Sequence, residues 1–374
     1  MKTPSDLSNE STPQIAAELL LPIPEVPPVD GWKQIEIQEN GEPLTPIGLF
    51  SGRYRGIISA SAYGEDLDIN SCYGSKGIEG GLTGVYLREE VAKKISEAQE
   101  LLPKNLHFVV YDAYRPMEVQ KALYDQYANA LREKYPDKNE EDIEKETALF
   151  VSLPSTDPTK PSTHNTGSSV DLAIFYLPDQ TEDRVHKLDE LIGVLDKAGN
   201  WQEIYPLEME RHALIAQNAQ MLNFGTKFDY GNEETKYAYI DYYEKVSQER
   251  DLRPEEIDAR DNRRMLYNIM KQVGGEAFPS EWWHFNFDNQ MAAVTSSRTT
   301  AKYGAAILSL ENIQYEINRH AVLDGTDAIL SAIEKNDAES LASVTSLGVV
   351  GKIAITGARD IRKTRLPQIE KIEP

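Results

Sequence analysis

From Trp32 onward, the spacing of apolar side chains changes repeatedly between a helical period and an extended one. Apolar residues recur every three or four positions over residues 91–102, which predicts an amphipathic helix. Residues 106–112 are rich in Phe and Val and predict a strand. Pro116 suits the first turn of a second helix, whose apolar face continues through residues 119–131. The pattern is therefore typical of a mixed α and β fold.

The middle of the chain predicts a buried strand followed by two helices. Residues 172–176 form an apolar run, and Asp171 stands directly before it. A carboxylate in that place is costly unless it is paired or coordinates a metal. The helices are predicted over residues 183–198 and 208–222. Two roles are open for this helical stretch: covering a site on the strand, or oligomerisation.

The two ends of the chain differ from its middle. Residues 1–31 combine a polar start with a cluster of prolines, which precludes a helix and favours an extended arm. Residues 293–374 contain two or three amphipathic helical stretches and no recognisable chemistry. We therefore predict an arm over 1–31, a main domain over 32–292 and a mainly helical C-terminal extension over 293–374. Packing on the domain, a dimer contact and partner binding are all open for the extension.

The composition of the chain argues against some classes of binding partner and bears on the cellular compartment. The chain of 374 residues has a net charge of −22 and a pI near 4.8, which argues against nucleic acid or an anionic membrane as a partner. Cys72 is the only cysteine, so an intrachain disulfide is not expected. No apolar run approaches the roughly 20 residues of a membrane span, and no secretory signal is visible. We expect a cytoplasmic protein, or a periplasmic one if a leader has been removed.

Four side chains carry the chemistry that the sequence suggests. His164 and Asp171 lie in PSTHNTGSSVD, and Glu281 and His284 lie in PSEWWHF. Two imidazoles and one carboxylate are a typical ligand set for a catalytic zinc, which keeps a fourth position open for water or substrate. A further carboxylate is what metal-assisted hydrolysis needs as a proton shuttle. Gly167 permits the tight turn that returns the loop histidine toward the following strand. The sequence therefore predicts a zinc hydrolase.

The spacing of Glu281 and His284 sets a geometric requirement. Residues three apart in a regular strand point to opposite faces of the sheet, yet both side chains should reach the same site. We therefore expect a bulge or a turn to interrupt the strand there. A charge among aromatic residues indicates a functional site rather than a solvated face. The neighbouring Trp282 and Trp283 are either plain core or walls of that site.

The order of the motifs resembles that of one family, the D-alanyl-D-alanine dipeptidases or VanX-type zinc metallopeptidases. The motifs are YDAYRP (111–116), STHNTGSSVD (162–171), GTKFDY (225–230) and EWWH (281–284). The resemblance extends over residues 52–290. It implies an α+β fold, in which a small antiparallel sheet carries the zinc site and helices surround it. This chain departs from the family at Ser169, where an alanine is usual, and that departure bears on substrate fit rather than on the chemistry.

The resemblance also implies a role for each matching residue. Glu281 would be the general base, and Arg115 would stabilise the oxyanion of the scissile carbonyl. The implied ligands of one Zn²⁺ per chain are His164, Asp171 and His284. The implied substrate-binding residues are Asp229, for the free ammonium, and Ser162, for a hydrogen bond. The implied reaction is hydrolysis of D-alanyl-D-alanine, a dipeptide of peptidoglycan and cell-wall metabolism, to two D-alanines.

Two other interpretations are open. One is a related zinc D,D-carboxypeptidase or endopeptidase that acts on cell-wall peptides, which would need an open cleft. The other is a catalytically inactive binding protein, against which Glu281 and Arg115 argue because a pure binder needs neither a base nor an oxyanion donor. The partner that we expect is a small dipeptide, with a homo-oligomer as a further possibility. Antibiotic resistance, wall recycling and nutrition are equally compatible with this sequence.

Overall fold

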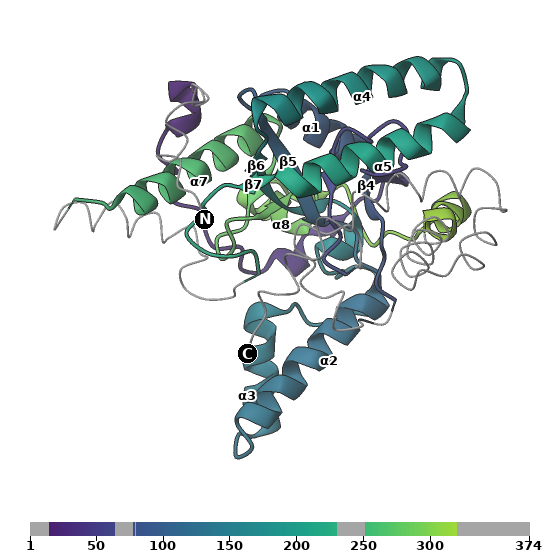
Figure 1. Ribbon diagram of the computed structural model, residues 1–374. Coiled ribbons are helices and arrows are strands. Elements are labelled where there is room, and N and C mark those ends of the chain that lie inside the picture. Colours follow the sequence, from purple (N-terminus) through teal and green to yellow (C-terminus); the bar gives the residue numbers. More distant parts are fainter. Residues whose placement is uncertain (1–14, 64–77, 79, 230–250, 320–374) are drawn as a thin grey trace.

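A computed structural model of the protein describes residues 15–63, 78, 80–229 and 251–319 (Figure 1). Cys72 and most of the predicted C-terminal extension lie outside the described residues. Helices and strands both contribute to the fold, so the predicted α+β class is confirmed. Within the described residues, no helix is both long enough and apolar enough to cross a membrane.

The described elements follow one another from an N-terminal turn to a C-terminal helix. The α-helices are α1 (Glu89–Gln99), α2 (Met117–Lys134), α3 (Glu140–Phe150), α4 (Asp179–Lys197), α5 (Trp201–Asn218), α7 (Pro254–Gln272) and α8 (Gln290–Thr295). The 3-10 turns are η2 (Ala17–Leu20), η3 (Trp32–Gln34) and η5 (His164–Thr166). The strands are β1 (Glu36–Ile37), β2 (Leu44–Ile47), β3 (Ile58–Ser59), β4 (Val85–Arg88), β5 (Leu106–Asp112), β6 (Ser169–Tyr176), β7 (Gln220–Met221), β8 (Glu276–Ala277), β9 (His284–Asn286) and β10 (Thr300–Ala301). Residues 310–319 are helical as well.

The main sheet has the strand order β3-β5-β6-β9-β8, and β7 also pairs with β6. All of its pairs are antiparallel except β3 and β5, which run parallel. The sheet is therefore mixed, whereas the sequence resemblance predicted an antiparallel one. A parallel pair needs a long crossover connection, and the chain between β3 and β5 supplies one through β4 and α1.

The central strand β6 is buried along all eight of its residues. Its side chains belong to one hydrophobic core with residues of α1, α5 and α7. A strand covered in this way shows a continuous apolar run rather than alternation, which is the pattern of residues 172–176. The predicted buried strand is confirmed, and β5 coincides with the strand predicted over residues 106–112.

Helices α4 and α5 form an antiparallel hairpin on one side of the molecule, and α2 and α3 form a second hairpin that projects from it (Figure 1). The helix predicted over residues 208–222 was misplaced, because α5 begins at Trp201 and ends at Asn218. Pro206 interrupts the helical pattern near that start, although it removes only one backbone hydrogen bond. Residues 220–221 form β7 instead, where pairing with β6 overrides the local helical preference.

Both ends of the described chain pack on the domain. Leu19 and Ile23 of the proline-rich arm are buried in the hydrophobic core. Asn268 of α7 fixes the same segment by donating hydrogen bonds to the carbonyl oxygens of Leu19 and Leu21. The domain limits at residues 31 and 292 stay predictions, but the arm is not separate from the core in the residues described.

The helix over residues 310–319 docks through a buried carboxylate. Glu316 is 9% exposed and accepts hydrogen bonds from the Thr83 hydroxyl at 2.8 Å and from the Tyr86 hydroxyl at 2.6 Å. It also accepts one from the backbone N–H of Gly84 at 3.1 Å. These donors belong to β4 and to the two residues directly before it, so the carboxylate joins the start of the predicted C-terminal extension to the domain.

Replacing Glu316 by alanine should therefore destabilise the protein by about 3 kcal/mol, because it leaves several buried donors without an acceptor. The measurement is the free energy of unfolding from urea titration. Glu311→Ala is the matched control, since Glu311 lies exposed on the same helix and its loss should change the stability by less than about 0.5 kcal/mol. Equal unfolding midpoints for the two variants would contradict the docking role.

Candidate metal centre

The register of the sheet brings together residues that are far apart in the sequence. Asp171 of β6 pairs directly with His284 of β9 on one side. On its other side, Asp171 pairs with Asp112 of β5, next to an irregularity of the ladder. Residues directly opposite each other in an antiparallel pair have neighbouring side chains. Two of the predicted ligands are therefore cross-strand neighbours in the middle of the sheet.

The third predicted ligand, His164, reaches this position from the turn η5 directly before β6. Gly167 ends the turn with a φ of +68°, and a Cβ atom there would lie 2.3 Å from a methyl carbon of Leu44. The predicted glycine turn is therefore confirmed. Arg88 holds the turn from outside by donating a hydrogen bond from Nε to the carbonyl oxygen of Thr166 at 2.8 Å.

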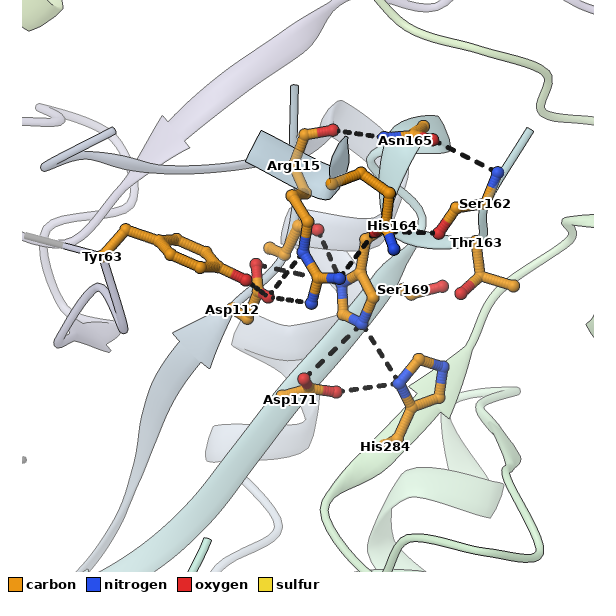
Figure 2. A network of polar contacts seen from close by, with 12 residues as sticks. Tyr63, Asp112, Arg115, Ser162, Thr163, His164, Asn165, Ser169, Asp171 and His284 are labelled. Carbon is orange, nitrogen blue, oxygen red and sulfur yellow. Dashed lines mark hydrogen bonds and ion pairs between the residues drawn. The ribbon is translucent and has the colours of Figure 1, made fainter. Parts of the chain in front are cut away.

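The three side chains converge in a buried cluster (Figure 2). His164 Nε2 lies 3.5 Å from Asp171 Oδ2 and 3.2 Å from His284 Nδ1. His284 Nδ1 lies 2.9 Å from Asp171 Oδ1. The potential ligand atoms all lie within 4.8 Å of one another, and each residue is 5% exposed. Two nitrogens and one carboxylate oxygen in such a cluster could hold a metal ion, and this donor set is one that zinc accepts.

Hydrogen bonding around the cluster suits a bound cation. His164 Nδ1 lies 2.8 Å from the carbonyl oxygen of Ala113, which can only accept, so Nδ1 carries the proton and Nε2 presents a lone pair. Such a partner is typical of metal-binding histidines. Asp171 Oδ1 is buried and has no hydrogen-bond partner, although His284 Nδ1 lies close to it. A cation between these atoms would satisfy the buried oxygen.

Burial and neighbouring charges shift the pKa values of the cluster. Burial lowers the pKa of His164, more than the carboxylates of Asp171 and Asp112 raise it. Burial would raise the pKa of Asp171, but the two imidazoles outweigh it and hold that pKa below its ordinary value. Burial would likewise lower the pKa of His284, but the adjacent Asp171 raises it. The shifts of Asp171 and His164 favour the charged carboxylate and the neutral imidazole, which are the forms that bind metals, whereas His284 must lose the proton that Asp171 favours before it can bind one.

Glu281 lies beside the cluster without belonging to it. The chain turns at Glu281 before β9 begins at His284, as expected from their spacing, and the turn includes a hydrogen bond from Glu281 N to the carbonyl oxygen of Phe278 at 3.3 Å. Glu281 Oε2 lies 3.7 Å from His284 Nδ1, and its side chain is 27% exposed. Burial raises the pKa of Glu281 to about 8, with Asp171 also raising it and His284 opposing. The intervening Trp282 and Trp283 are buried in the core.

Arg115 is fixed between the end of β5 and the start of α2. Its Nε and one terminal nitrogen donate to the same Asp112 oxygen at 3.2 and 2.5 Å, and the other terminal nitrogen donates to Gln120 Oε1 at 2.6 Å. Its backbone N–H donates to the carbonyl oxygen of His164. Burial would lower the pKa of Arg115, but Asp112 raises it well above its usual value. The guanidinium is therefore a charged donor that is held rigidly beside the cluster (Figure 2).

The two predicted substrate-binding residues come from different parts of the chain. Ser162 stands just before the turn η5, and Asp229 follows β7. Ser162 is buried, and its Oγ lies 3.4 Å from Gln120 Oε1, the atom that also accepts from Arg115. Asp229 is exposed and has a φ of +57°. Its negative charge contributes to the raised pKa of Glu281, so it lies within electrostatic reach of that carboxylate.

The segment that carries Asp229 is tied to the Glu281 turn by aromatic packing. The rings of Phe224 and Trp282 stack in parallel with centroids 4.2 Å apart. Trp282 Nε1 donates to Thr226 Oγ1 at 2.9 Å. Trp282 therefore belongs to the core and also links the segment that carries Asp229 to the turn at Glu281.

Sequence reasoning missed Asp112 and Gln120, which hold Arg115, and Tyr63, whose hydroxyl donates to Asp112. A signal for Asp112 was present, because it is a carboxylate at the end of an apolar strand, the same cue that pointed to Asp171. Gln120 and Tyr63 gave no signal, since uncharged polar residues at these places are common on protein surfaces.

No family model matches the chain. The chain is 25% identical over 277 residues to a D-alanyl-D-alanine dipeptidase of Synechocystis sp. (strain ATCC 27184 / PCC 6803 / Kazusa). That match covers 71% of this chain and 90% of the relative. It is a distant relationship, which supports the resemblance to the VanX-like family and suggests a peptidase activity.

Proposed function

We propose that this protein hydrolyses D-alanyl-D-alanine to two D-alanines with one zinc ion bound by His164, Asp171 and His284. The observation that carries the proposal is the convergence of two imidazole nitrogens and a carboxylate within 4.8 Å of one another in a buried cluster. A separate carboxylate and a fixed guanidinium beside the cluster supply the other groups that peptide hydrolysis needs. The distant dipeptidase relative supports the same substrate.

Zinc in this site would supply a Lewis acid for the scissile carbonyl and a bound water of lowered pKa. A bound cation would lower the raised pKa of Glu281, and the resulting carboxylate would take a proton from the attacking water and pass it to the leaving amine. Its partial exposure lets the carboxylate meet both water and substrate. Arg115 would donate hydrogen bonds to the carbonyl oxygen as negative charge develops there, and its mounting on Asp112 keeps it oriented before the substrate arrives.

Recognition of both charged ends would restrict the enzyme to a free dipeptide. Asp229 would pair with the substrate ammonium, a role supported by its exposure and by its electrostatic effect on Glu281. Ser162 lies beside Gln120 and so close to the guanidinium side of the site, where its hydroxyl would donate to or accept from the substrate backbone. This assignment is the one that the family resemblance implied.

The test is release of D-alanine from D-alanyl-D-alanine by the zinc-loaded protein, with L-alanyl-L-alanine and an N-acetylated tripeptide ending in D-alanyl-D-alanine for comparison. Cleavage of the free D,D-dipeptide alone supports the proposal. Cleavage of the blocked tripeptide would replace it by a carboxypeptidase, because that substrate has no free ammonium for Asp229. Bound zinc without cleavage of any of these peptides would indicate a binding protein.

Replacing Arg115 by alanine should lower kcat for this dipeptide by about 10²–10³-fold, the usual cost of losing one oxyanion donor. Zinc content should not change, since Arg115 contributes no ligand atom. Steady-state kinetics with metal analysis measures both quantities. Arg184→Ala serves as the control, because Arg184 lies exposed on α4 and should leave kcat unchanged. A drop in kcat of less than threefold for Arg115→Ala would remove Arg115 from the mechanism.

A further inference from the structure

We infer that Asn286 is a positioning residue that fixes the tautomer and orientation of His284, and that Ser169 and Asn289 hold it in place for this task. The inference rests on the proposed zinc site, since it concerns how one ligand presents its lone pair. All three residues are at most 1% exposed, and they form one hydrogen-bonded network directly behind His284.

The start of α8 fixes the orientation of the Asn289 side-chain amide. Asn289 is the N-cap of that helix, and its side chain accepts a hydrogen bond from the backbone N–H of Ala292 at 3.0 Å. A backbone N–H can only donate, so the Asn289 atom facing it must be the oxygen. The amide nitrogen of Asn289 consequently points the other way, 3.0 Å from Asn286 Oδ1 and 3.0 Å from Ser169 Oγ.

Asn289 and Ser169 together orient the side-chain amide of Asn286. Its Oδ1 receives the N–H of Asn289 and, at 2.8 Å, the hydroxyl of Ser169. Rotating the Asn286 amide by half a turn would set its NH₂ group against the NH₂ group of Asn289. In a buried network that arrangement leaves donors unsatisfied, at about 1–3 kcal/mol each. The Nδ2 atom of Asn286 accordingly donates to Met291 Sδ at 3.3 Å, and its oxygen is presented to His284.

The orientation of Asn286 determines which nitrogen of His284 carries the proton. The third neighbour of this oxygen is His284 Nε2, 3.1 Å from Asn286 Oδ1. Because that oxygen accepts, Nε2 carries the proton, and in the neutral imidazole that binds a metal the lone pair is therefore on Nδ1. Nδ1 is the atom that faces Asp171 and His164 in the cluster. With His164 held by Ala113 in the same way, both imidazoles direct a lone pair at one point.

Ser169 helps to hold Asn286 in this orientation. It pairs with Asn286 across β6 and β9, and its hydroxyl is the second donor to Asn286 Oδ1. An alanine at this position, as is usual in the resembled family, would leave Asn286 with Asn289 alone. The hydroxyl noted as a departure from the family pattern is thus satisfied, and it points to the metal ligand's support rather than to the substrate.

The test measures zinc affinity by competition with a chelator for Asn286→Ala and Ser169→Ala. We expect zinc to bind about 10–100-fold more weakly to Asn286→Ala, the usual range for such partners of a ligand, and Ser169→Ala to fall between that variant and the wild type. Asn268→Ala is the matched control, since Asn268 lies on α7 and donates to the N-terminal arm rather than to this network, and it should keep the wild-type affinity. Cobalt substitution adds a spectroscopic readout, because a reoriented imidazole changes the ligand-field bands.

A second measurement covers the case in which Asn286→Ala does not fold. Long-range ¹H–¹⁵N correlation spectra of the zinc-loaded wild type should show His284 protonated at Nε2 and metal-bound at Nδ1. Zinc bound through Nε2, or an unchanged zinc affinity in both variants, would overturn the inference and leave the proposed hydrolysis intact. A wild type that binds zinc through Nδ1 but cleaves no dipeptide would remove the proposed function and leave this inference standing. A wild type without zinc affinity would overturn both.

Discussion

Replacing Glu281 by glutamine should lower kcat for D-alanyl-D-alanine by about 10²–10⁴-fold, the usual contribution of a general base, while zinc stays bound. Glu281 Oε2 lies 3.7 Å from His284 Nδ1 and does not belong to the three-residue cluster, so it can act on water without serving as a ligand. Glutamine keeps the shape of the side chain and removes only its capacity to take a proton. Steady-state kinetics and metal analysis on the same preparation measure the two effects.

Glu276→Gln is the matched control for this change. Glu276 lies on β8, which pairs with β9. It forms an ion pair with Lys271 at 2.6 Å and does not belong to the ligand cluster. Its replacement should leave kcat unchanged. If Glu281→Gln retains wild-type turnover, the base is another group. If Glu281→Gln loses its zinc, the carboxylate is a ligand, and the three-ligand assignment is incomplete.

The local elements of the site could be predicted because short stretches of sequence determine them. The apolar run of residues 106–112 gave the limits of β5, and Gly167 gave the turn before β6. The three-residue spacing of Glu281 and His284 gave the turn before β9, because a regular strand would have separated the two side chains. In each case the cause lies within a few residues of its effect.

What could not be predicted depends on register between distant strands. Asp112, which the sequence analysis missed, is a neighbour of Asp171 only because β5 and β6 pair with one particular offset. The helix start at Trp201 and the strand β7 were missed for the same reason, since pairing and packing override local preference there. Asn286 follows His284 by two residues in a three-residue strand, yet its partners Ser169 and Asn289 are known only from the fold.

The position of Arg115 depends both on the local sequence and on the way the chain folds around it. The motif YDAYRP placed Asp112 three residues before Arg115, but their ion pair forms because the chain leaves β5 at Asp112 and enters α2 after Pro116. Pro116 stands at the N-cap of that helix, where its missing N–H costs little. The same connection lets the backbone of Arg115 bond to that of His164. One short loop thus fixes the proposed oxyanion donor relative to a proposed metal ligand.

Removing one imidazole from the cluster should abolish zinc binding and, with it, essentially all turnover. His164→Ala and His284→Ala each leave a nitrogen and a carboxylate, which are too few protein ligands for a catalytic zinc. His186→Ala is the matched control, because the His186 side chain is 72% exposed on α4 and should keep one zinc per chain. Metal analysis after gel filtration gives the stoichiometry, and D-alanine release gives the activity.

A chelator should reproduce these losses in the wild type, and added zinc should reverse them there but in neither ligand variant. Thermal unfolding separates lost metal from lost fold, because a ligand that binds only the native state raises its stability in proportion to the logarithm of its concentration. The melting temperature of the wild type should therefore rise with added zinc, whereas those of His164→Ala and His284→Ala should not respond. If added zinc raised the melting temperature of both variants, the zinc would bind at another site. The cluster of His164, Asp171 and His284 would then hold a different cation.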